Sequence, residues 1–584
     1  MVARSVRSMR PASCWLAVPE PLECDLLVIG SGAAGLCAAT TAAIAGLRVI
    51  VAERADVLGG TTAWSGGWMW LPRNALARAG GIDEPIEAPR AYLTDVLGNR
   101  FDPDRIDAFL GAAPAMVDFL TANGFEFEAG NRICDIYGDR PGAGTGGRSL
   151  IAAPFDARRL GKRLALLRRT KRETAFAGMP IQAGPDLAAF LNATRRPAAA
   201  WHAARRVIAH ARDLALHGRS MHLVNGVALV ARLFQIADHH GVRWRTRTRA
   251  VRLIAHDGTV TGAEFDGPDG VQTIHARRGT VLATGGFSAS AALRSAHFPH
   301  AAEHLTLAVP EADGSAAAMA APLGAAFDTD LAAAGAWCPV SRVTWPDASA
   351  GVFPHIVERG KPGVIAVRGD GRRFVNEADG YHDFVAALLA ATPPDHAARA
   401  WLLCDDRFLR RWGLGVVKPD PVSARHWRRS GYLKSGATLE ELARLCGIAP
   451  ELVTTVARYN ADAAAGRDDT FNRGWSPYNR YQGDPARSPN PNVAPIERAP
   501  FHAVEVVPGS FGSFAGLRTD GRARVLSEGG LPIPGLYAAG ADMASIMAGH
   551  YPAGGINLGP AMVFGYLAAR DAANATCDDG DLTR

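Results

Sequence analysis

The sequence lacks long hydrophobic runs and closely spaced cysteines. Hydrophobic residues make up 48% of the 584 positions, but no window of about eighteen consecutive apolar residues occurs, so no transmembrane helix is expected. The eight cysteines show no CxxC, CxxCH or metal-type spacing. This pattern excludes a disulfide framework, an iron–sulfur cluster, a c-type haem and a cysteine-based metal site, and we expect no metal. A reducing cytoplasm fits this cysteine usage.

A strong excess of one charge is also missing. The chain holds 63 basic and 57 acidic residues, a formal net charge of +6, and aromatic residues do not alternate with basic runs as in single-strand binders. We therefore expect no nucleic-acid partner. Residues 1–22 contain one short apolar stretch, Trp15 to Val18, which is too short for the core of a signal peptide. We interpret residues 1–22 as a disordered tail.

A glycine-rich motif follows this tail. Residues 25–29 (DLLVI) form a short apolar run, and GSGAAG at 30–35 leads into an alanine-rich stretch, the order of a strand, a turn and a helix. In a dinucleotide-binding turn, Gly30 permits the tight bend, Gly32 lets the backbone approach a pyrophosphate and Gly35 lets helix and strand pack closely. The expected dinucleotide contacts here are Gly30, Ser31, Gly32, Ala34 and Gly35.

An acidic residue stands where ribose binding needs one. A second strand, residues 48–52, ends at Glu53, at the strand end where a carboxylate accepts hydrogen bonds from ribose hydroxyls. A glycine turn alone can be explained by packing, but strand, helix and acid together favour a dinucleotide site, for NAD and FAD alike. Residues 59–74 (GGTTAWSGGWMWLPRN) add glycines and hydroxyls that bring backbone N–H groups toward a ligand.

The stretch from Glu53 to Gly67 resembles the fumarate reductase and 3-ketosteroid dehydrogenase flavoprotein superfamily, in which Glu-x5-Gly-Gly-Thr/Ser-Thr-x2-Ser-Gly-Gly lies along FAD. The resemblance implies a non-covalently bound FAD. The contacts implied in this loop are Gly60, Thr61, Thr62, Ser65, Gly66 and Gly67. Residues 279–287 (GTVLATGGF) resemble the second FAD strand of the superfamily and imply a contact from Gly285.

Residues 511–570 resemble the closing segment of the superfamily almost throughout. The resemblance implies a strand over residues 536–539 and a helix opening near Pro560. The N-terminus of that helix would lie under the pyrimidine end of the flavin and stabilise negative charge there. The FAD contacts implied in this segment are Gly540, Asp542, Gly555, Asn557 and Leu558.

Within the superfamily, the chain is more similar to 3-ketosteroid Δ1-dehydrogenases than to succinate or fumarate enzymes. GLRTD-x3-ARVL, PIPGLYAAG and Tyr-Pro-x-x-Gly follow one another within residues 516–555. No histidine stands in the loop at 59–67, where membrane-bound succinate enzymes attach flavin covalently, and no haem motif accompanies it. Residues 371–383 (GRRFVNEADGYHD) place Tyr381 where fumarate reductases carry a proton-donating arginine and steroid dehydrogenases carry a tyrosine.

The resemblance also implies catalytic roles for the C1–C2 desaturation of a 3-ketosteroid. Tyr551 and the backbone N–H of Gly555 match the pair that hydrogen-bonds the 3-keto oxygen, an arrangement that makes C2 more acidic. Tyr381 matches the base that takes the C2 proton, while flavin N5 accepts hydride from C1. The electrons then pass to an external, quinone-like acceptor.

Tyr381 needs help, because a tyrosine with a reference pKa near 10 is a poor base on its own. Tyr137 or His382 could supply a partner, and the sequence leaves the choice open. Tyr137 lies in DIYGDRPG, which resembles the DYYPE-x-PGG segment that carries a third active-site tyrosine in steroid enzymes, although Ile136 replaces one of its two adjacent tyrosines. Without the motifs, a loop tyrosine more often anchors structure than acts as a base.

The resemblance covers residues 24–155 and 222–584 and leaves an insertion over 156–221. Residues 158–172 combine eight lysine and arginine residues with leucines, and we interpret them as a basic, leucine-bearing helix. Such a helix could make a peripheral contact with anionic lipid and help to collect a sterol. Alternatively it packs on the FAD domain with its charges in water, which its short apolar stripe favours.

The length of 584 residues predicts two domains. We expect an α/β fold, α+β overall, in which a Rossmann-like FAD-binding domain is built from residues 23–295 and 501–584. An inserted α+β catalytic domain occupies 296–500, with a helical stretch at 439–466, and the active site lies in the cleft between the domains. The alternatives are a fumarate reductase-like reductase of an activated C=C bond, a dehydrogenase of another cyclic ketone, and a flavin-binding protein without catalysis.

Overall fold

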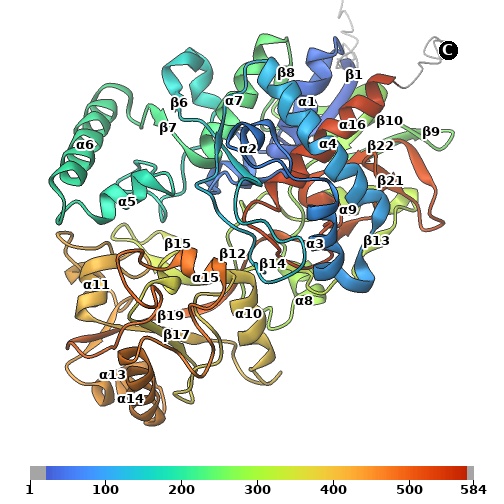
Figure 1. Cartoon of the computed structure of the whole chain (residues 1–584). Helices are drawn as coiled ribbons and strands as arrows, with labels where there is room; N and C mark the ends of the chain where they lie inside the picture. Colours follow the sequence, from blue (N-terminus) through green and yellow to red (C-terminus); the bar gives the residue numbers. More distant parts are fainter. Residues whose placement is uncertain (1–21, 575–584) are drawn as a thin grey trace, which may run out of the picture.

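The computed structural model describes residues 22–574, so the expected tail lies outside the described residues except for its last position. Two layered bodies of helices and strands lie against each other (Figure 1). Blue N-terminal and red C-terminal segments meet in the first body, whereas yellow and orange segments make up the second. No helix within the described residues is long and apolar enough to cross a membrane.

The first body is built on an eight-stranded sheet with a parallel centre. β1 (Leu22–Ile29) lies between β2 (Val49–Ala52) and β11 (Gly270–Leu282), parallel to both, and β22 (Pro532–Ala538) pairs parallel with β11. Every residue of β2 is buried, as expected of a parallel strand covered by helices. The other strands of this sheet are β8 (Arg243–Arg245), β9 (Arg249–His256), β10 (Thr259–Gly267) and β21 (Arg524–Leu526).

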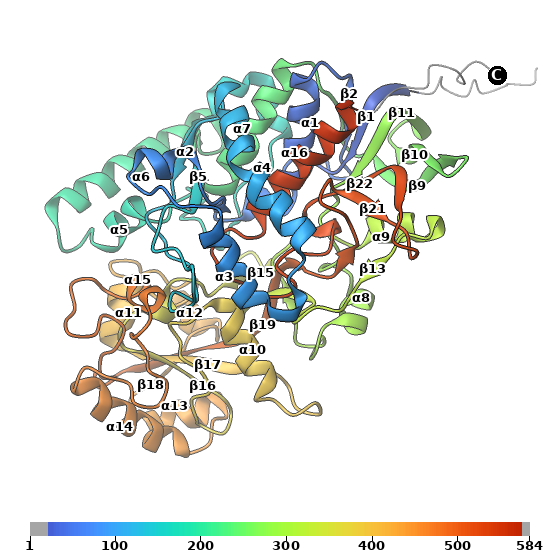
Figure 2. The same ribbon diagram turned by 45° about the vertical axis from the view of Figure 1, so that its right-hand side comes forward.

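Helices from the two chain ends pack together on this sheet. α1 (Ala33–Ile44) lies against α16 (Leu558–Asn574), and the two stay side by side in Figures 1 and 2. The two helices lie so close together that a Cβ atom on Gly565 would be 2.4 Å from the Ala34 carbonyl oxygen. The prediction of a Rossmann-like α/β body assembled from both chain ends is confirmed.

The second body is built on a seven-stranded sheet centred on β19 (Phe501–Ser513). β14 (Gly335–Thr344) and β17 (Ala400–Asp405) both pair antiparallel with β19. The strand that begins at the expected boundary near 501 thus lies in the second sheet. The division of the chain into domains stays a prediction. The remaining strands of this sheet are β12 (Leu305–Thr306), β15 (Ala350–Pro354), β16 (Val364–Val367) and β18 (Lys434–Gly436).

The helical stretch expected at 439–466 consists of two helices. α13 (Leu439–Cys446) and α14 (Glu451–Ala464) are separated by Gly447, whose φ of +66° ends the first of them, and by Pro450. The other helices of the second body are α10 (Tyr381–Ala390), α11 (Asp406–Trp412), α12 (Arg425–Arg429) and α15 (Pro477–Gln482). The peripheral helices of the first body are α2 (Ala75–Ala79), α3 (Glu87–Leu97), α4 (Pro103–Ala122), α7 (Asn225–His239), α8 (Ala291–His297) and α9 (Ser315–Ala320).

The basic segment at 158–172 differs from the expected helix. Residues Ala157–Leu166 form 3-10 turns interrupted at Gly161, whose φ of 52° and ψ of −129° are not helical. Leu160 and Leu167 are buried, and Leu164 and Leu166 pack partly buried against the same core, so the leucines of this segment face the protein. This favours the alternative in which the segment packs on the FAD-binding body. The true helices of the insertion come later, as α5 (Pro185–Leu191) and α6 (Pro197–His217).

Candidate active site

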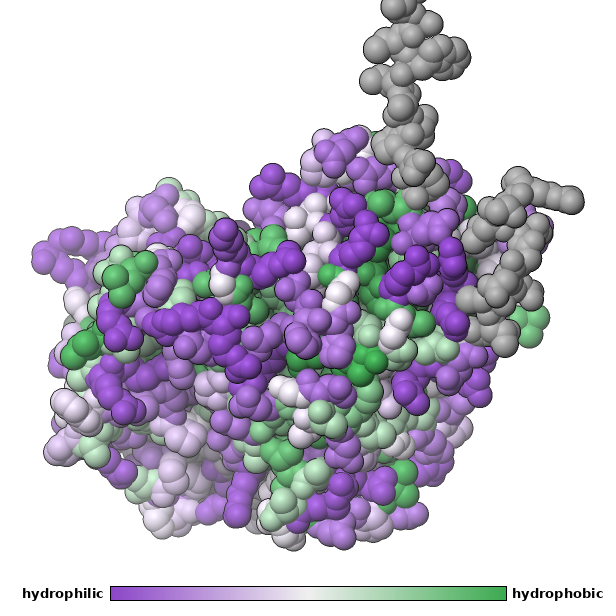
Figure 3. All heavy atoms as spheres, turned by 90° about the horizontal axis from the view of Figure 1, so that it is seen from above, coloured by the Kyte–Doolittle hydropathy of each residue, from purple (hydrophilic) through white to green (hydrophobic). Residues whose placement is uncertain are grey.

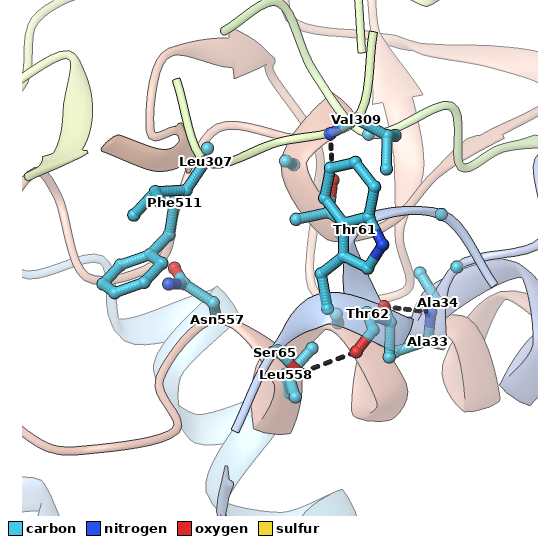
Figure 4. Close-up of a pocket in the computed structure, with 18 of the residues that line it drawn as sticks. Ala33, Ala34, Thr61, Thr62, Ser65, Leu307, Val309, Phe511, Asn557 and Leu558 are labelled. Carbon is cyan, nitrogen blue, oxygen red and sulfur yellow. Dashed lines mark hydrogen bonds between the residues drawn. The ribbon is translucent and has the colours of Figure 1, made fainter. Parts of the chain in front are cut away.

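A large cavity extends from the β1–α1 turn to the second body. Most of the residues expected at the site line it together. These are Gly30, Ser31, Gly32, Ala34, Glu53, Gly60, Thr61, Thr62, Ser65, Gly66, Gly67, Gly285, Tyr381, Gly540, Tyr551, Gly555, Asn557 and Leu558. Figure 4 shows Phe511 and Asn557 on one side of this space, opposite Thr61 and Thr62.

The glycines of the β1–α1 turn serve different purposes. Gly30 has a φ of +107°, and a Cβ atom there would lie 2.2 Å from the Ala283 carbonyl oxygen, so the fold itself requires glycine. A Cβ atom on Gly32 would meet only the Thr62 hydroxyl, at 3.6 Å. The protein therefore leaves open the space beside Gly32, at the N-terminus of α1, where a pyrophosphate is best accommodated.

Glu53 is held at the end of β2 by hydrogen bonds. The Ser31 hydroxyl donates to Oε2 over 2.6 Å, and the backbone N–H of Ala55 donates to Oε1 over 2.9 Å. Burial raises the pKa of this carboxyl, and these hydrogen bonds oppose that shift. The carboxylate borders the cavity where a ribose hydroxyl would donate to it.

The loop that follows uses its own side chains to keep its shape. The Thr61 hydroxyl accepts a hydrogen bond from the Val309 N–H at 3.1 Å, the Thr62 hydroxyl accepts one from the Ala33 N–H at 2.9 Å, and the Ser65 hydroxyl donates to the Thr62 carbonyl over 2.7 Å (Figure 4). The loop is therefore fixed to α1 and to the 307–309 segment before any ligand is present.

Two expected cofactor contacts do not line the cavity. Gly35 lies behind the turn, where a Cβ atom would be 2.1 Å from the Gly30 carbonyl oxygen, so it serves the helix–strand packing. Asp542 accepts hydrogen bonds from the Thr284 hydroxyl at 2.9 Å and from the Gly286 N–H at 2.8 Å. Its carboxylate joins the loop after β11 to the end of β22 and is a structural element of the site wall.

Tyr381 and Tyr551 meet at the far end of the cavity. Tyr381 begins α10 and Tyr551 stands before α16, and their ring centroids are 4.9 Å apart. Asn557 donates a hydrogen bond to the Tyr551 hydroxyl over 3.1 Å. Burial raises the pKa of both phenols above their usual value, and the adjacent Tyr551 raises that of Tyr381 further. Tyr551 is therefore a neutral hydroxyl that can donate to a ligand oxygen.

Gly555 offers a second donor at the same place. Its φ is +102°, and a Cβ atom would lie 2.6 Å from the Trp70 backbone nitrogen, so no other residue fits without displacing β3 (Met69–Trp70). Its carbonyl accepts the Trp70 N–H at 3.1 Å. The Gly555 N–H makes no hydrogen bond to the part of the chain that the structure describes and borders the cavity, which makes it available to a ligand.

Neither expected partner of Tyr381 is bonded to it. Tyr137 does not line the cavity, and its hydroxyl donates to Asp383 Oδ1 over 2.8 Å. Burial raises the pKa of the Asp383 carboxyl to about 7. Nδ1 of His382 accepts the Trp337 N–H at 3.2 Å, and burial lowers the pKa of this imidazole to about 3, so it stays neutral. Tyr137 and His382 therefore hydrogen-bond to other protein groups near the site, and neither is hydrogen-bonded to Tyr381.

Several other residues that line the cavity were not predicted as site residues from the sequence. Tyr478 of α15 borders the cavity, and Gln482 donates a hydrogen bond to its hydroxyl over 2.9 Å. Phe511 of β19 contacts Tyr381 edge to face, with ring centroids 5.4 Å apart. Lys171 of the insertion also lines the cavity. No local motif marks these positions, since only the packing of the two bodies brings them together.

These features fit a flavin dinucleotide. A glycine turn with an open space, a buried acid at the ribose position and a preformed hydroxyl-rich loop occupy one end of the cavity. A phenol and a free N–H occupy the other end, beside the N-terminus of α16. The site therefore combines a long cofactor cradle with hydrogen-bond donors for a second, smaller molecule.

Comparisons with known proteins agree with this geometry. A family model described as FAD binding domain matches residues 25–558. The chain is 38% identical to a 4-oxocyclohex-2-ene-1-carboxylate 5-dehydrogenase of Sinomonas cyclohexanicum, covering 95% of this chain and 94% of the relative. It is 35% identical to a 3-oxosteroid 1-dehydrogenase of Mycobacterium tuberculosis, covering 94% of this chain and 98% of that protein. The solved structure of a 3-ketosteroid Δ1-dehydrogenase from Sterolibacterium denitrificans, in complex with 1,4-androstadiene-3,17-dione, superposes with a TM-score of 0.86 at 33% identity, covering 94% and 99% of the two chains.

Proposed function

Since this chain belongs to the FAD-binding family that includes the 3-oxosteroid 1-dehydrogenases, we propose that it introduces the C1–C2 double bond into a 3-ketosteroid. The protein is an FAD-dependent oxidoreductase acting on CH–CH groups. Of the two hydrogens lost, one leaves as a proton and the other as a hydride. FAD, when bound, supplies the hydride acceptor.

The convergence of Tyr381, Tyr551 and the Gly555 N–H on one end of the cavity carries this proposal. Tyr551 and Gly555 donate two hydrogen bonds to the ketone oxygen, which stabilises the negative charge that develops there as the C2 proton leaves. Because burial raises the pKa of Tyr551, its hydroxyl stays protonated and keeps its donor through the reaction.

Tyr381 takes the C2 proton in this scheme. In the ligand-free site burial and Tyr551 raise the pKa of Tyr381, so its phenolate is scarce at neutral pH. Transfer of the C2 proton to Tyr381 should therefore become faster as the pH rises and the phenolate fraction increases.

Product analysis tests this function. The flavin-loaded protein is incubated with androst-4-ene-3,17-dione and an artificial quinone acceptor, and the steroid is examined by mass spectrometry and NMR. We expect a product lighter by two hydrogen atoms with new vinylic protons at C1 and C2. An unchanged steroid, or a double bond elsewhere in the rings, would reject the assignment. We also propose that the electrons pass to an external, quinone-like acceptor. Repeating this assay with different acceptors compares the rates that they support.

A second candidate substrate is a cyclohexenone carboxylate, favoured by the relative at 38% identity and by one cavity residue. The Lys171 side chain lines the cavity with 10% of its surface exposed, and its ion pair with Glu173 is long, at 3.4 Å. A cation in this position could receive a substrate carboxylate. For this candidate we expect Lys171→Gln to lower kcat/KM for 4-oxocyclohex-2-ene-1-carboxylate and to leave kcat/KM for the steroid unchanged.

A further inference from the structure

The exposed and buried faces of α6 are the reverse of those in an ordinary surface helix. Its polar side chains His202, Arg206, His210 and Asp213 turn toward the protein. Their hydrogen-bond and ion-pair partners are Asp186 for His202 and Arg206, the Pro180 carbonyl for Arg206, the Ala177 carbonyl for His210, and Arg158 and the Met221 N–H for Asp213. The helix is thus fixed by polar contacts, and hydrophobic burial does not explain its orientation.

The apolar side chains of α6 lie in solvent. Trp201 is 72% exposed, and Ile208 and Leu216 are each 68% exposed. Five of the twelve large exposed hydrophobic residues in the range 22–574 belong to this one helix, the other two being Val207 and Leu214. Such a concentration marks an interaction surface, because single exposed apolar residues are normally scattered. In Figure 3, hydrophobic and strongly hydrophilic side chains mix at the left end of the molecule, the side on which α6 lies in Figure 1.

The region around α6 is strongly basic. Residues 156–221 contain 14 lysine and arginine residues and four acidic residues, whereas the whole chain has a net charge of only +6. The four acids are all engaged in ion pairs within the insertion. Arg195, Arg196, Arg205 and Arg212 are exposed, and none of the four makes an ion pair with any residue of the described chain. An unneutralised positive surface therefore borders the apolar stripe.

We propose that this face of α6 docks on the surface of a bilayer containing anionic phospholipids. Trp201, Ile208 and Leu216 enter the boundary between headgroups and acyl chains, where tryptophan is favoured. The arginines beside them face the phosphate groups, and each adds electrostatic attraction to an anionic surface. The docking surface consists of Trp201, Ile208, Leu216, Arg205 and Arg212.

A lipid surface fits this face better than a second copy of the chain. In a two-fold dimer the same face meets itself, so the uncompensated basic charge of one insertion would face that of the other. Like charges repel at such short range. An anionic bilayer supplies the opposite charge and an apolar interior together.

The insertion also takes part in the cavity. Thr174, Ile181 and Ala183 line it from the segment that leads into α5 and α6. Bilayer docking through α6 would hold this part of the cavity wall close to the membrane. The docking itself requires no particular substrate, so its test does not depend on the proposed reaction.

Vesicle flotation of the flavin-loaded full chain tests the docking. One set of vesicles contains phosphatidylglycerol and phosphatidylcholine, and the other contains phosphatidylcholine alone. Ile208→Ser/Leu216→Ser removes apolar contact, and Arg205→Gln/Arg212→Gln removes charge. The matched controls are Val271→Ser/Leu531→Ser, at positions 68% and 72% exposed on other hairpins, and Arg444→Gln/Arg458→Gln on α13 and α14. Melting temperature and flavin content confirm that each variant is folded.

We expect the wild-type protein and both controls to float with the anionic vesicles, and each α6 variant to lose partitioning by about tenfold or more. The proposal is overturned if the wild type does not float, if it floats equally with neutral vesicles, or if the α6 variants float like the controls. Concentration-dependent self-association that only the α6 variants abolish would assign the face to a second copy.

Discussion

The rings of Tyr381 and Tyr551 meet edge to face at 74°, with centroids 4.9 Å apart, although one stands at the start of α10 in the second body and the other precedes α16 in the first. Burial raises the pKa of both phenols, and the contact with Tyr551 raises that of Tyr381 further. The contact between the two rings therefore depends on how the two bodies pack together, and the proposed chemistry depends on the same packing.

Replacing Gly555 by alanine should impair catalysis severely. The added Cβ would lie 2.6 Å from the Trp70 nitrogen at a φ of +102°, so the backbone must shift and the free N–H moves away from the ketone. Loss of one such donor typically costs about a hundredfold or more in kcat. Steady-state kinetics of Gly555→Ala checks this, with Gly529→Ala as control because its nearest atom would be Ser527 Oγ at 3.8 Å. Comparable kcat values for the two variants would remove Gly555 from the proposed oxyanion site.

A side chain at position 32 should displace the cofactor and spare the fold. A Cβ atom there meets nothing closer than 3.6 Å, so Gly32→Val fits the protein while its methyl groups enter the space proposed for the pyrophosphate. The flavin-to-protein absorbance ratio should fall by about tenfold or more, while the melting temperature of flavin-stripped protein stays near that of flavin-stripped wild type. A variant that keeps a full complement of flavin would show that the pyrophosphate lies elsewhere.

Activity should rise with pH. Burial and Tyr551 hold the pKa of Tyr381 above its usual value, so the fraction of phenolate increases about tenfold per pH unit below that pKa. A plot of log kcat/KM should therefore climb toward alkaline pH until substrate binding or protein stability limits it. Any residual activity of Tyr381→Phe should lack this rise. A profile that is flat for the wild type would argue against a tyrosine base.

His382 should make the protein less stable in acid. Burial lowers its folded-state pKa from 6.5 to about 3, so the unfolded chain binds more protons between these values and stability falls as the pH drops through this window. At pH 4 the largest effect from this residue is about 3 kcal/mol at 1.36 kcal/mol per pKa unit. His382→Asn keeps an acceptor for the Trp337 N–H and cannot titrate. Chemical denaturation at pH 7 and pH 4 should show a smaller loss for this variant than for the wild type.

Local sequence patterns predicted the residues that line one end of the cavity. The glycine turn, Glu53 and the 59–67 loop act through neighbouring backbone, and the structure brings them together along one cavity. Asp542 and Tyr137 were placed in contact with ligands by resemblance alone, and both turn instead to protein partners, Thr284 and Asp383. Which way such a side chain points depends on packing between distant segments, and a motif does not encode it.

In the insertion, too, the composition could be predicted from the sequence but the orientation of the side chains could not. Its basic composition was visible in the sequence, but the leucines of 158–172 are buried or partly buried against the core and the exposed apolar stripe lies on α6. A helix whose polar face packs inward violates the periodicity rule that assigns apolar faces to the core. Tyr478 was missed for a related reason, because it reaches the cavity only through the docking of α15 against the FAD-binding body.

Anaerobic stopped-flow mixing of the purified protein with androst-4-ene-3,17-dione tests the central claim most directly. The oxidised flavin absorbance of the wild type should disappear, and Tyr551→Phe and Tyr381→Phe should slow this loss by about a hundredfold or more. Tyr566→Phe is the matched control, since this tyrosine of α16 packs on Phe119 and does not line the cavity, so the variant should react like the wild type. Flavin that stays oxidised in the wild type despite bound FAD, or that bleaches equally fast in both variants, would contradict ketosteroid dehydrogenation by this pair of tyrosines.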